Sequence, residues 1–398
     1  MKVVIAMDSF KGSLSSMAAG RAAREGVLRA CPNAEVIVRP LADGGEGTVD
    51  ALVEGLNGQM ASVQVTGPLG APVESHYGIL ADGVAVMEMA SACGLTLVPL
   101  ERRDPRLTTT YGLGEMILDA LERGCRSFII GIGGSATNDG GIGMLSALGV
   151  RFFTAAGACA GMDGKAAARV EKIDVSHADP RLAQCSFRIA CDVESPLCGP
   201  SGASHVYGMQ KGATPEIAAE LDAGLAHFAA VVRKTLGKDM ADQAGAGAAG
   251  GLGYGFASFL SAELVPGTAL VLDAIHLEED FAGADFAITG EGCLDFQTAM
   301  GKAPSGVARL ARQCGVITLA FAGTVGQGAA AVHQSGVDAY FSILQAPSTR
   351  AEAMDTKCAY QNLAASVEQV FRLIAAERAR QSSGSRTDRA GCLPTARP

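Results

Sequence analysis

Four glycine-rich loops carry most of the side chains that could do chemistry, at residues 8–13, 42–48, 131–141 and 289–304. Each combines glycines, which let backbone N–H groups approach an anion closely, with at least one carboxylate. Their acids are candidates for binding Mg²⁺ or accepting hydrogen bonds from substrate hydroxyls, and their lysines for neutralising phosphate. These candidates are Asp8, Asp43, Glu46, Asp139, Glu291 and Asp295 among the acids, and Lys11 and Lys302 among the lysines. One such acid could simply cap a helix or turn, but four similar loops indicate a shared role in handling phosphate.

The loop at residues 131–141 reads GIGGSATNDGG and stands between a strand-like run at 127–130 and a helix-like run at 142–147. Such a junction directs backbone N–H groups at an anion. The loop also matches the dinucleotide-binding pattern G-x-G-x-x-A. That pattern requires an acid at the end of the next strand, about 20 residues on, and residues 150–154 contain none. The loop therefore favours a phosphate ligand over a nicotinamide dinucleotide.

Asp192 follows the stretch 187–190, where we expect a strand, with Cys191 between them. An acid at the carboxyl end of a strand is a candidate general base, although an aspartate before a nearby proline can also start a turn. Other catalytic patterns are missing from the sequence. The three Gly-Lys pairs do not form a P-loop, the six histidines share no spacing, and there is no G-x-S-x-G motif.

The elements that position these loops alternate between strand and helix at both ends of the chain. Apolar, β-branched runs predict strands at 2–7, 34–39, 284–289, 316–321 and 338–343, and helical spacing predicts helices at 14–30, 49–56, 272–281, 305–313 and 358–379. Ligands of parallel sheets bind at the carboxyl ends of strands, where these loops lie. The pattern predicts an α/β protein with a doubly wound parallel sheet.

The middle of the chain has a different pattern, which predicts a second α/β domain inserted into the first. Strands at 61–67, 73–80 and 84–89 form a meander, and helices are expected at 111–123 and 215–236. We therefore expect one domain from residues 1–58 and 271–380, an inserted domain at 59–270, and a disordered tail at 381–398.

Composition excludes several classes of protein. The formal net charge of −9 disfavours nucleic acid as a partner, and no run reaches the roughly 18 apolar residues that a membrane span requires. The eleven cysteines contain no C-x-x-C pair, which disfavours a zinc site or a disulfide framework. We expect a cytoplasmic protein with no nucleic-acid or membrane partner.

Taken together, the loops resemble the bacterial glycerate kinase type I family, over residues 1 to about 375. The resemblance rests on DSFKGS at 8–13, ADGGEGT at 42–48, GGSATNDGG at 133–141, CDV at 191–193, and TGEG at 289–292 with Asp295, Gln297-Thr298 and Gly301-Lys302. It implies a flavodoxin-like domain with a second α/β domain inserted into it and an active site between the two. It also implies phosphorylation of D-glycerate by ATP and Mg²⁺, usually to 2-phosphoglycerate.

The resemblance further implies roles for individual residues. Asp192 would accept the hydroxyl proton of glycerate, and Lys11 would neutralise the transferring phosphate. Substrate would contact Ser9, Asp43, Glu46 and Lys302, with Asp43 and Glu46 also candidate metal ligands. The candidates for binding the substrate carboxylate are Ser9, Lys11 and Lys302. Nucleotide would contact Gly133, Gly134, Ser135, Thr137, Asn138, Asp139, Glu291 and Asp295. The chain departs from the family pattern at Cys293, Phe296 and Met209, where a basic residue, a small residue and proline are usual.

Two other functions remain open from the sequence. An NAD(P)-dependent oxidoreductase of a small hydroxy acid would use the G-x-G-x-x-A loop. A non-catalytic protein that binds small anions would keep the glycine-rich loops without turnover. The oligomeric state is not indicated by any pattern.

Overall fold

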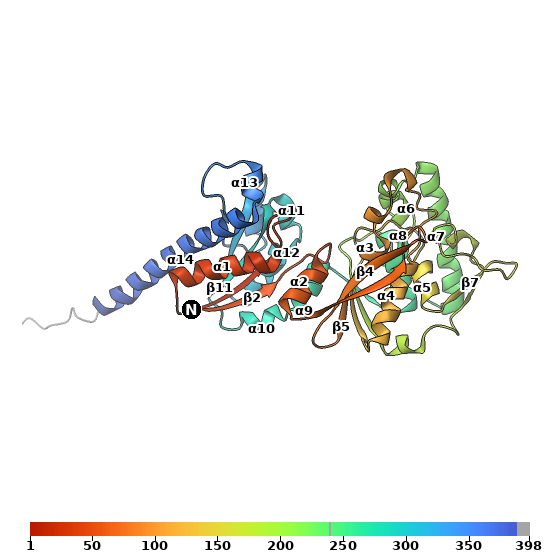
Figure 1. Cartoon of the computed structure of the whole chain (residues 1–398), viewed down its shortest axis with the longest axis horizontal. Coiled ribbons are helices and arrows are strands. Elements are labelled where there is room, and N and C mark those ends of the chain that lie inside the picture. Colours follow the sequence, from red (N-terminus) through yellow and green to blue (C-terminus); the bar gives the residue numbers. More distant parts are fainter. Residues whose placement is uncertain (239, 388–398) are drawn as a thin grey trace, which may run out of the picture. The chain divides into compact units, whose positions relative to one another are not determined.

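The computed structural model describes residues 1–238 and 240–387. The chain divides into two compact units: unit 1 combines residues 1–41 with those from 275 onward, and unit 2 comprises residues 42–274. Each unit is built around its own β-sheet and covered by helices (Figure 1). The predicted α/β class is confirmed.

Unit 1 contains a five-stranded sheet in the order β13-β12-β11-β1-β2, and all of its strand pairs are parallel. The strands are β1 (Lys2–Met7), β2 (Glu35–Pro40), β11 (Phe286–Leu294), β12 (Ile317–Val325) and β13 (Ala339–Ser342). All five were predicted from their apolar, β-branched runs. Residues that precede the insertion pair directly with residues that follow it, as when Val4 of β1 aligns with Ala287 of β11.

The longest helices of unit 1, α1 and α14, pack along each other (Figure 1). The helices of this unit are α1 (Ser16–Ala30), α10 (Leu277–Phe281), α11 (Phe296–Ala299), α12 (Ala303–Gln313), α13 (Arg350–Met354) and α14 (Thr356–Thr387), with a 3₁₀ turn at η6 (Ala329–His333). Phe286 and Phe371 meet edge to face in the core between the sheet and α14. This core fixes the strand ends from which the loops emerge.

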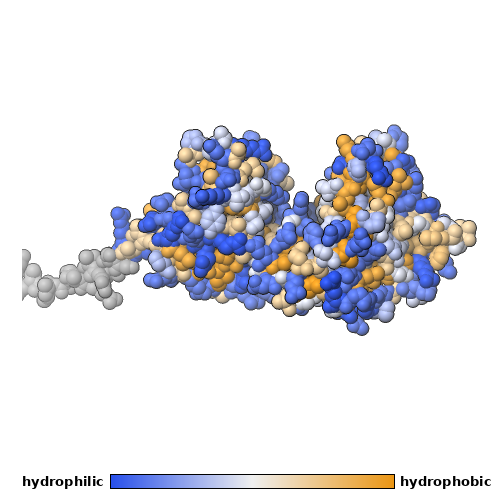
Figure 2. Space-filling model, in the orientation of Figure 1, coloured by the Kyte–Doolittle hydropathy of each residue, from blue (hydrophilic) through white to orange (hydrophobic). Residues whose placement is uncertain are grey.

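Unit 2 contains a six-stranded mixed sheet in the order β10-β9-β6-β5-β4-β3. The three strands β3, β4 and β5 form the predicted antiparallel meander, and β5, β6, β9 and β10 run parallel. The strands are β3 (Gln59–Thr66), β4 (Pro72–Ile79), β5 (Val84–Glu88), β6 (Ser127–Gly131), β9 (Ser186–Ala190) and β10 (Glu263–Val265). A separate antiparallel pair joins β7 (Arg151–Phe153) to β8 (Lys172–Asp174), and the exposed loop after β7 forms a pale orange projection in Figure 2.

Helix α7 of unit 2 has the bounds that its sequence predicts. It begins after Thr214, whose hydroxyl accepts a hydrogen bond from the N–H of Ile217, and ends at Gly237 in a left-handed conformation. The helices of this unit are α2 (Thr48–Gly55), α3 (Ala90–Cys93), α4 (Tyr111–Glu122), α5 (Ile142–Ala147), α6 (Ala203–Tyr207), α7 (Pro215–Leu236), α8 (Ala248–Phe259) and α9 (Gly267–Ala274). Short 3₁₀ turns are η1 (Leu95–Leu97), η2 (Leu100–Arg102), η3 (Ala167–Arg169), η4 (Pro180–Gln184) and η5 (Met209–Lys211).

Three expectations differ from the structure. The division between units falls after residues 41 and 274 rather than after 58 and 270, because α2 packs on β4 and β5 of unit 2. The helix expected at 272–281 is broken into α9 and α10, since His276 adopts a left-handed backbone with φ of 53°. Residues 381–387 continue helix α14 instead of starting a disordered tail, and residues 388–398 lie outside the described part of the chain.

Candidate active site

A cavity of about 280 Å³ lies in unit 2, at the carboxyl ends of β6 and β9. These neighbouring parallel strands end together, with Gly131 aligned to Ala190, so the loops that follow them meet at one edge of the sheet. The loop after β6 contributes residues 133–135 to the cavity wall, and the loop after β9 contributes Asp192. Asp43 also lines the cavity, from the loop before α2.

Asp192 lies at this cavity with its carboxylate held in place. One carboxylate oxygen accepts a hydrogen bond of 2.8 Å from the backbone N–H of Gly267. Partial removal from water raises the pKa of Asp192, and the nearby charge of Asp43 raises it further, while the bond from Gly267 opposes the shift. An oriented carboxylate with a raised pKa is suited to accepting a proton from a substrate hydroxyl.

Lys211 also lines the cavity, and no sequence pattern pointed to it. Its side chain comes from η5 and is only 2% exposed. The ammonium donates hydrogen bonds to the hydroxyl of Ser135, at 2.8 Å, and to the carbonyl of Thr137, at 2.7 Å. Burial lowers the pKa of Lys211 to about 7, and the charge of Asp139 opposes this shift. Among the described residues that line the cavity, Lys211 is the one lysine or arginine.

The loop at 131–141 has two parts with different surroundings. Gly133, Gly134 and Ser135 line the cavity, whereas Thr137, Asn138 and Asp139 are fully buried. The amide nitrogen of Asn138 donates to the hydroxyl of Ser204 at 3.0 Å. The carboxylate of Asp139 accepts four hydrogen bonds, from the N–H and hydroxyl of Thr110 and from the N–H groups of Gly141 and Gly143. The buried half of the loop thus fixes the half that lines the cavity.

The two predicted metal ligands of unit 2 are placed differently. Asp43 lines the cavity, and one of its carboxylate oxygens accepts a hydrogen bond of 3.0 Å from the N–H of Gly45. Glu46 is exposed and is not among the residues that line the cavity. Over residues 1–238 and 240–387, no group of three or more histidine, cysteine or acidic side chains is placed to hold a metal ion.

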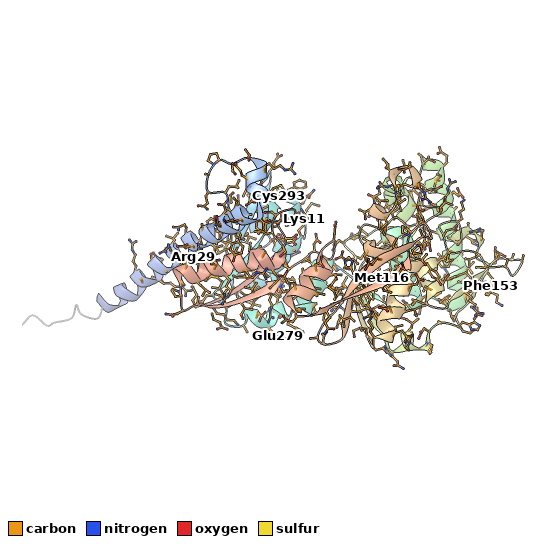
Figure 3. The ribbon with its side chains drawn as sticks, viewed as in Figure 1. Lys11, Arg29, Met116, Phe153, Glu279 and Cys293 are labelled. Carbon is orange, nitrogen blue, oxygen red and sulfur yellow. The ribbon has the colours of Figure 1, made fainter. Side chains whose placement is uncertain are left out.

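Unit 1 brings together the remaining predicted residues at the carboxyl ends of β1 and β11. Ser9 and Lys11 follow β1, and Gly292 of β11 lies against the backbone of Lys11. Figure 3 shows Lys11 and Cys293 at the same end of this unit. In the loop after β1, the N–H of Ser9 donates a hydrogen bond of 2.6 Å to the carboxylate of the preceding residue, Asp8.

Glu291 is the central acid of this group in unit 1. It accepts a hydrogen bond of 2.5 Å from the hydroxyl of Thr298 and lies 4.0 Å from the ammonium of Lys302. Burial raises the pKa of Glu291, and Asp8 and Asp295 add to the shift, while Thr298 and Lys302 oppose it. Asp295 also caps the short helix α11. The three residues that depart from the family pattern are all exposed, namely Cys293, Phe296 and Met209.

Acidic, glycine-rich loops at the carboxyl ends of parallel strands define this chain as an α/β protein with the type of site that enzymes of small anionic substrates use. The model of the Glycerate kinase family matches residues 3–375. The chain belongs to the glycerate kinase family, and the resemblance seen in its loops is confirmed.

Named relatives and a solved structure are similar over nearly the whole chain. A glycerate kinase of Halalkalibacterium halodurans is 50% identical over 353 residues, which cover 88% of this chain and 93% of the relative. The glycerate 2-kinase of Escherichia coli K12 is 46% identical over 364 residues, covering 91% and 95%. The crystal structure of a putative glycerate kinase 2 from Salmonella typhimurium LT2 has a TM-score of 0.88 and 44% identity, covering 95% of this chain and 99% of that chain.

Over residues 1–238 and 240–387, every helix lacks the combination of length and hydrophobicity that a transmembrane helix needs.

Proposed function

We propose that this chain transfers the γ-phosphoryl group of ATP to the 2-hydroxyl of D-glycerate. Membership of the glycerate kinase family supports the reaction, and the name of the E. coli relative, glycerate 2-kinase, supports the choice of hydroxyl. The observation that carries the proposal in the structure is the oriented carboxylate of Asp192 at a cavity that also contains Asp43 and Lys211. The cavity, of about 280 Å³, has room for a three-carbon acid.

In this mechanism Asp192 accepts the proton of the attacking hydroxyl. Its raised pKa makes it a stronger proton acceptor than an ordinary aspartate, and the N–H of Gly267 keeps one oxygen fixed. Asp43, on the same cavity wall, can accept a hydrogen bond from the second hydroxyl of glycerate. Fixing the acceptor in this way supplies the positioning on which phosphoryl transfer depends.

The charged residues of unit 1 are suited to the nucleotide and its metal ion. Mg²⁺ usually keeps several waters and takes one or two protein carboxylates together with phosphate oxygens. Glu291, with Asp8 and Asp295 near it, offers such carboxylates without a complete cage. Bound there, Mg²⁺ would neutralise charge on the transferring phosphate. Lys11 and Lys302 would neutralise phosphate oxygens, and Ser9 would hydrogen-bond to one of them.

Within the cavity-lining segment 133–135, the backbone of Gly134 is assigned to the transferring phosphate, because a glycine backbone can approach an anion closely. Thr137, Asn138 and Asp139 support that segment from behind. We also infer that unit 1 is a flavodoxin-like domain interrupted by unit 2. When its five strands are numbered 1 to 5 along the chain, their order across the sheet is 2-1-3-4-5, which is the flavodoxin-like order.

Incubation with D-glycerate and Mg·ATP, followed by phosphorus NMR, tests the proposed reaction. The expected product is 2-phosphoglycerate. Production of 3-phosphoglycerate alone would correct the hydroxyl, and glycerate binding without any phosphoglycerate at high protein concentration would favour a non-catalytic anion-binding protein. L-Glycerate in place of D-glycerate serves as the control for stereochemistry.

The Asp192→Asn variant tests the proton acceptor. The amide oxygen of asparagine can still accept the N–H of Gly267, but it cannot take up a proton. We expect kcat to fall by about 10²-fold or more with the folded state intact by circular dichroism.

Asp222→Asn is the matched control for that variant. Asp222 also accepts a backbone N–H, from Gly199 at 2.9 Å, but it is not among the residues that line the cavity. Its replacement should leave kcat within about twofold of the wild type, because Asp222 lies outside the cavity. Near-normal turnover of Asp192→Asn would remove Asp192 as the base.

A further inference from the structure

The ammonium of Lys211 is buried without a carboxylate partner. Over the described residues no ion pair involves it, and its two hydrogen bonds go to the hydroxyl of Ser135 and the carbonyl of Thr137. The charge of Asp139 raises the pKa of Lys211, but the carboxylate of Asp139 already accepts four hydrogen bonds from other groups. Burying an unpaired charge costs free energy, so such an ammonium at a cavity wall indicates that an anion completes the site.

An ammonium group has three N–H donors, and the two bonds of Lys211 leave one for a ligand. The wall beside it is open, because Gly133 lines the same cavity and a side chain on Gly133 would meet no atom within 4 Å. A planar anionic group can therefore lie against this backbone next to the ammonium.

We propose that Lys211 is the residue that binds the carboxylate of the three-carbon substrate. The inference rests on the proposed function and extends it, since it names the group that recognises the acid. The cavity would then contact the two ends of D-glycerate differently: Lys211 binds the carboxylate, while Asp192 and Asp43 receive the hydroxyls.

This assignment replaces the one suggested by the loops alone. The residues considered for the substrate carboxylate, Ser9, Lys11 and Lys302, all belong to unit 1. Lys211, by contrast, belongs to the same unit as Asp43 and Asp192 and lines the same cavity. One rigid wall can thus set the distance between the bound carboxylate and the base, which is what orientation of the substrate requires.

The binding should be linked to protonation. Burial keeps the pKa of the free Lys211 at about 7, and a bound carboxylate favours the charged ammonium and raises that pKa. Glycerate binding should therefore take up protons above about pH 7. Other titratable or charged groups line the cavity or act on this lysine from the elements around it. They are Asp139 after β6, Asp43 before α2, Cys191 and Asp192 after β9, and Tyr207 of α6.

Calorimetry of D-glycerate binding to the full-length wild-type chain tests this linkage directly. Titrations near pH 8 in two buffers of different ionisation enthalpy measure the protons exchanged. We expect uptake of close to one proton by the wild type and almost none by Lys211→Met. A wild-type chain that binds glycerate without proton uptake overturns the proposal, and this result needs no variant to fold.

Steady-state kinetics supply the second test. Lys211→Met should raise KM for D-glycerate by about 10- to 100-fold, the loss of one charged hydrogen bond, while KM for ATP stays within about threefold. Lys211→Arg, which remains charged, should recover part of the affinity. If Lys211 had only a structural role, the Lys211→Met variant would take up as many protons on binding glycerate as the wild type does. That result would overturn the proposal.

Ser135→Ala is the matched control, because it removes one hydrogen bond from the ammonium and keeps the charge. It should change KM less than Lys211→Met does and preserve the proton uptake. Failure of the kinase reaction is distinguishable from failure of this inference. A wild-type chain that makes no phosphoglycerate contradicts the proposed function, whereas normal KM and proton uptake in Lys211→Met contradict only the role of Lys211.

Discussion

Asp139 is an acid whose role at the residue scale is structural. It is fully buried, and its carboxylate accepts four hydrogen bonds that join the start of α4 to the start of α5. Burial raises the pKa of Asp139, and the same four bonds oppose the shift. The carboxylate therefore tolerates its buried position because each oxygen is satisfied, and it fixes the loop whose first half lines the cavity.

Asp139→Asn should destabilise the protein. An amide cannot accept hydrogen bonds through its nitrogen, so at least one N–H of Gly141, Gly143 or Thr110 would lose its partner. We expect the free energy of unfolding to fall by about 2–3 kcal/mol, measured by urea denaturation. Asp163→Asn, at a partly exposed loop position bonded to the N–H of Lys165, is the control and should change it by less than about 1 kcal/mol. Equal stability of the two variants would contradict the structural role.

The contrast between Asp192 and Lys211 shows which residues of the cavity wall the sequence could predict. Asp192 lies two residues after the end of β9, and the carboxyl end of a parallel strand is where α/β proteins place ligand-binding residues. Lys211 lies in a 3₁₀ turn of three residues, Met209–Lys211. A segment this short has no hydrophobic periodicity from which the burial of Lys211 could be predicted. Its contact with Ser135 spans 76 residues, and such a long-range contact is set by tertiary packing rather than by local pattern.

At the scale of elements, the packing of α1 on α14 depends on the absence of a side chain at Gly26. A Cβ at this position would lie 2.4 Å from the carbonyl oxygen of Ala364 and 2.9 Å from Cβ of Val367. Both contacts are too short for real atoms, and one of them is with rigid backbone. The two helices can approach this closely only because residue 26 is glycine.

Gly26→Ala should therefore destabilise unit 1, although alanine is the better helix former by up to about 1 kcal/mol. Overpacking of this kind costs about 1–3 kcal/mol, so we expect a net loss, measured as a lower midpoint of thermal unfolding. Arg24→Ala on the exposed side of α1 is the control and should leave the midpoint nearly unchanged. A rise in the midpoint for Gly26→Ala would show that the helices can separate at no cost.

The elements themselves were mostly predictable, whereas their breaks were not. The bounds of α7 follow from local signals, namely the cap at Thr214, Pro215 and the terminal Gly237. Helix α8 instead contains three consecutive left-handed residues, Ala249, Gly250 and Gly251. Residue 250 must be glycine, because a Cβ there would lie 2.1 Å from the carbonyl oxygen of Thr137. The order of the strands likewise depends on contacts between distant segments.

At the scale of the whole molecule, unit 2 is a continuous segment within a discontinuous unit 1. The chain enters and leaves unit 2 at neighbouring points, because Gly44 lies against the backbone of Gly267. An inserted domain with adjacent ends disturbs its host little. The change of pattern predicted an insertion that begins at residue 59, whereas unit 2 begins at residue 42 and includes α2, whose contacts with β4 and β5 have no local signature.

The segment 42–274, expressed alone, should fold and bind D-glycerate. It has its own sheet and hydrophobic core, and all the residues that line its cavity, including Asp43, Asp192 and Lys211, lie within it. Because Mg·ATP is assigned to the charged groups of unit 1, the isolated segment should bind the acid without catalysing transfer. Calorimetry would measure the binding, and a cooperative thermal transition would show that the segment folds.

Lys211→Met in the same segment is the control and should abolish the binding while the transition remains. A segment that folds cooperatively but does not bind glycerate would place essential acid-binding groups in unit 1, and it would return Lys11 and Lys302 as the candidates for the carboxylate.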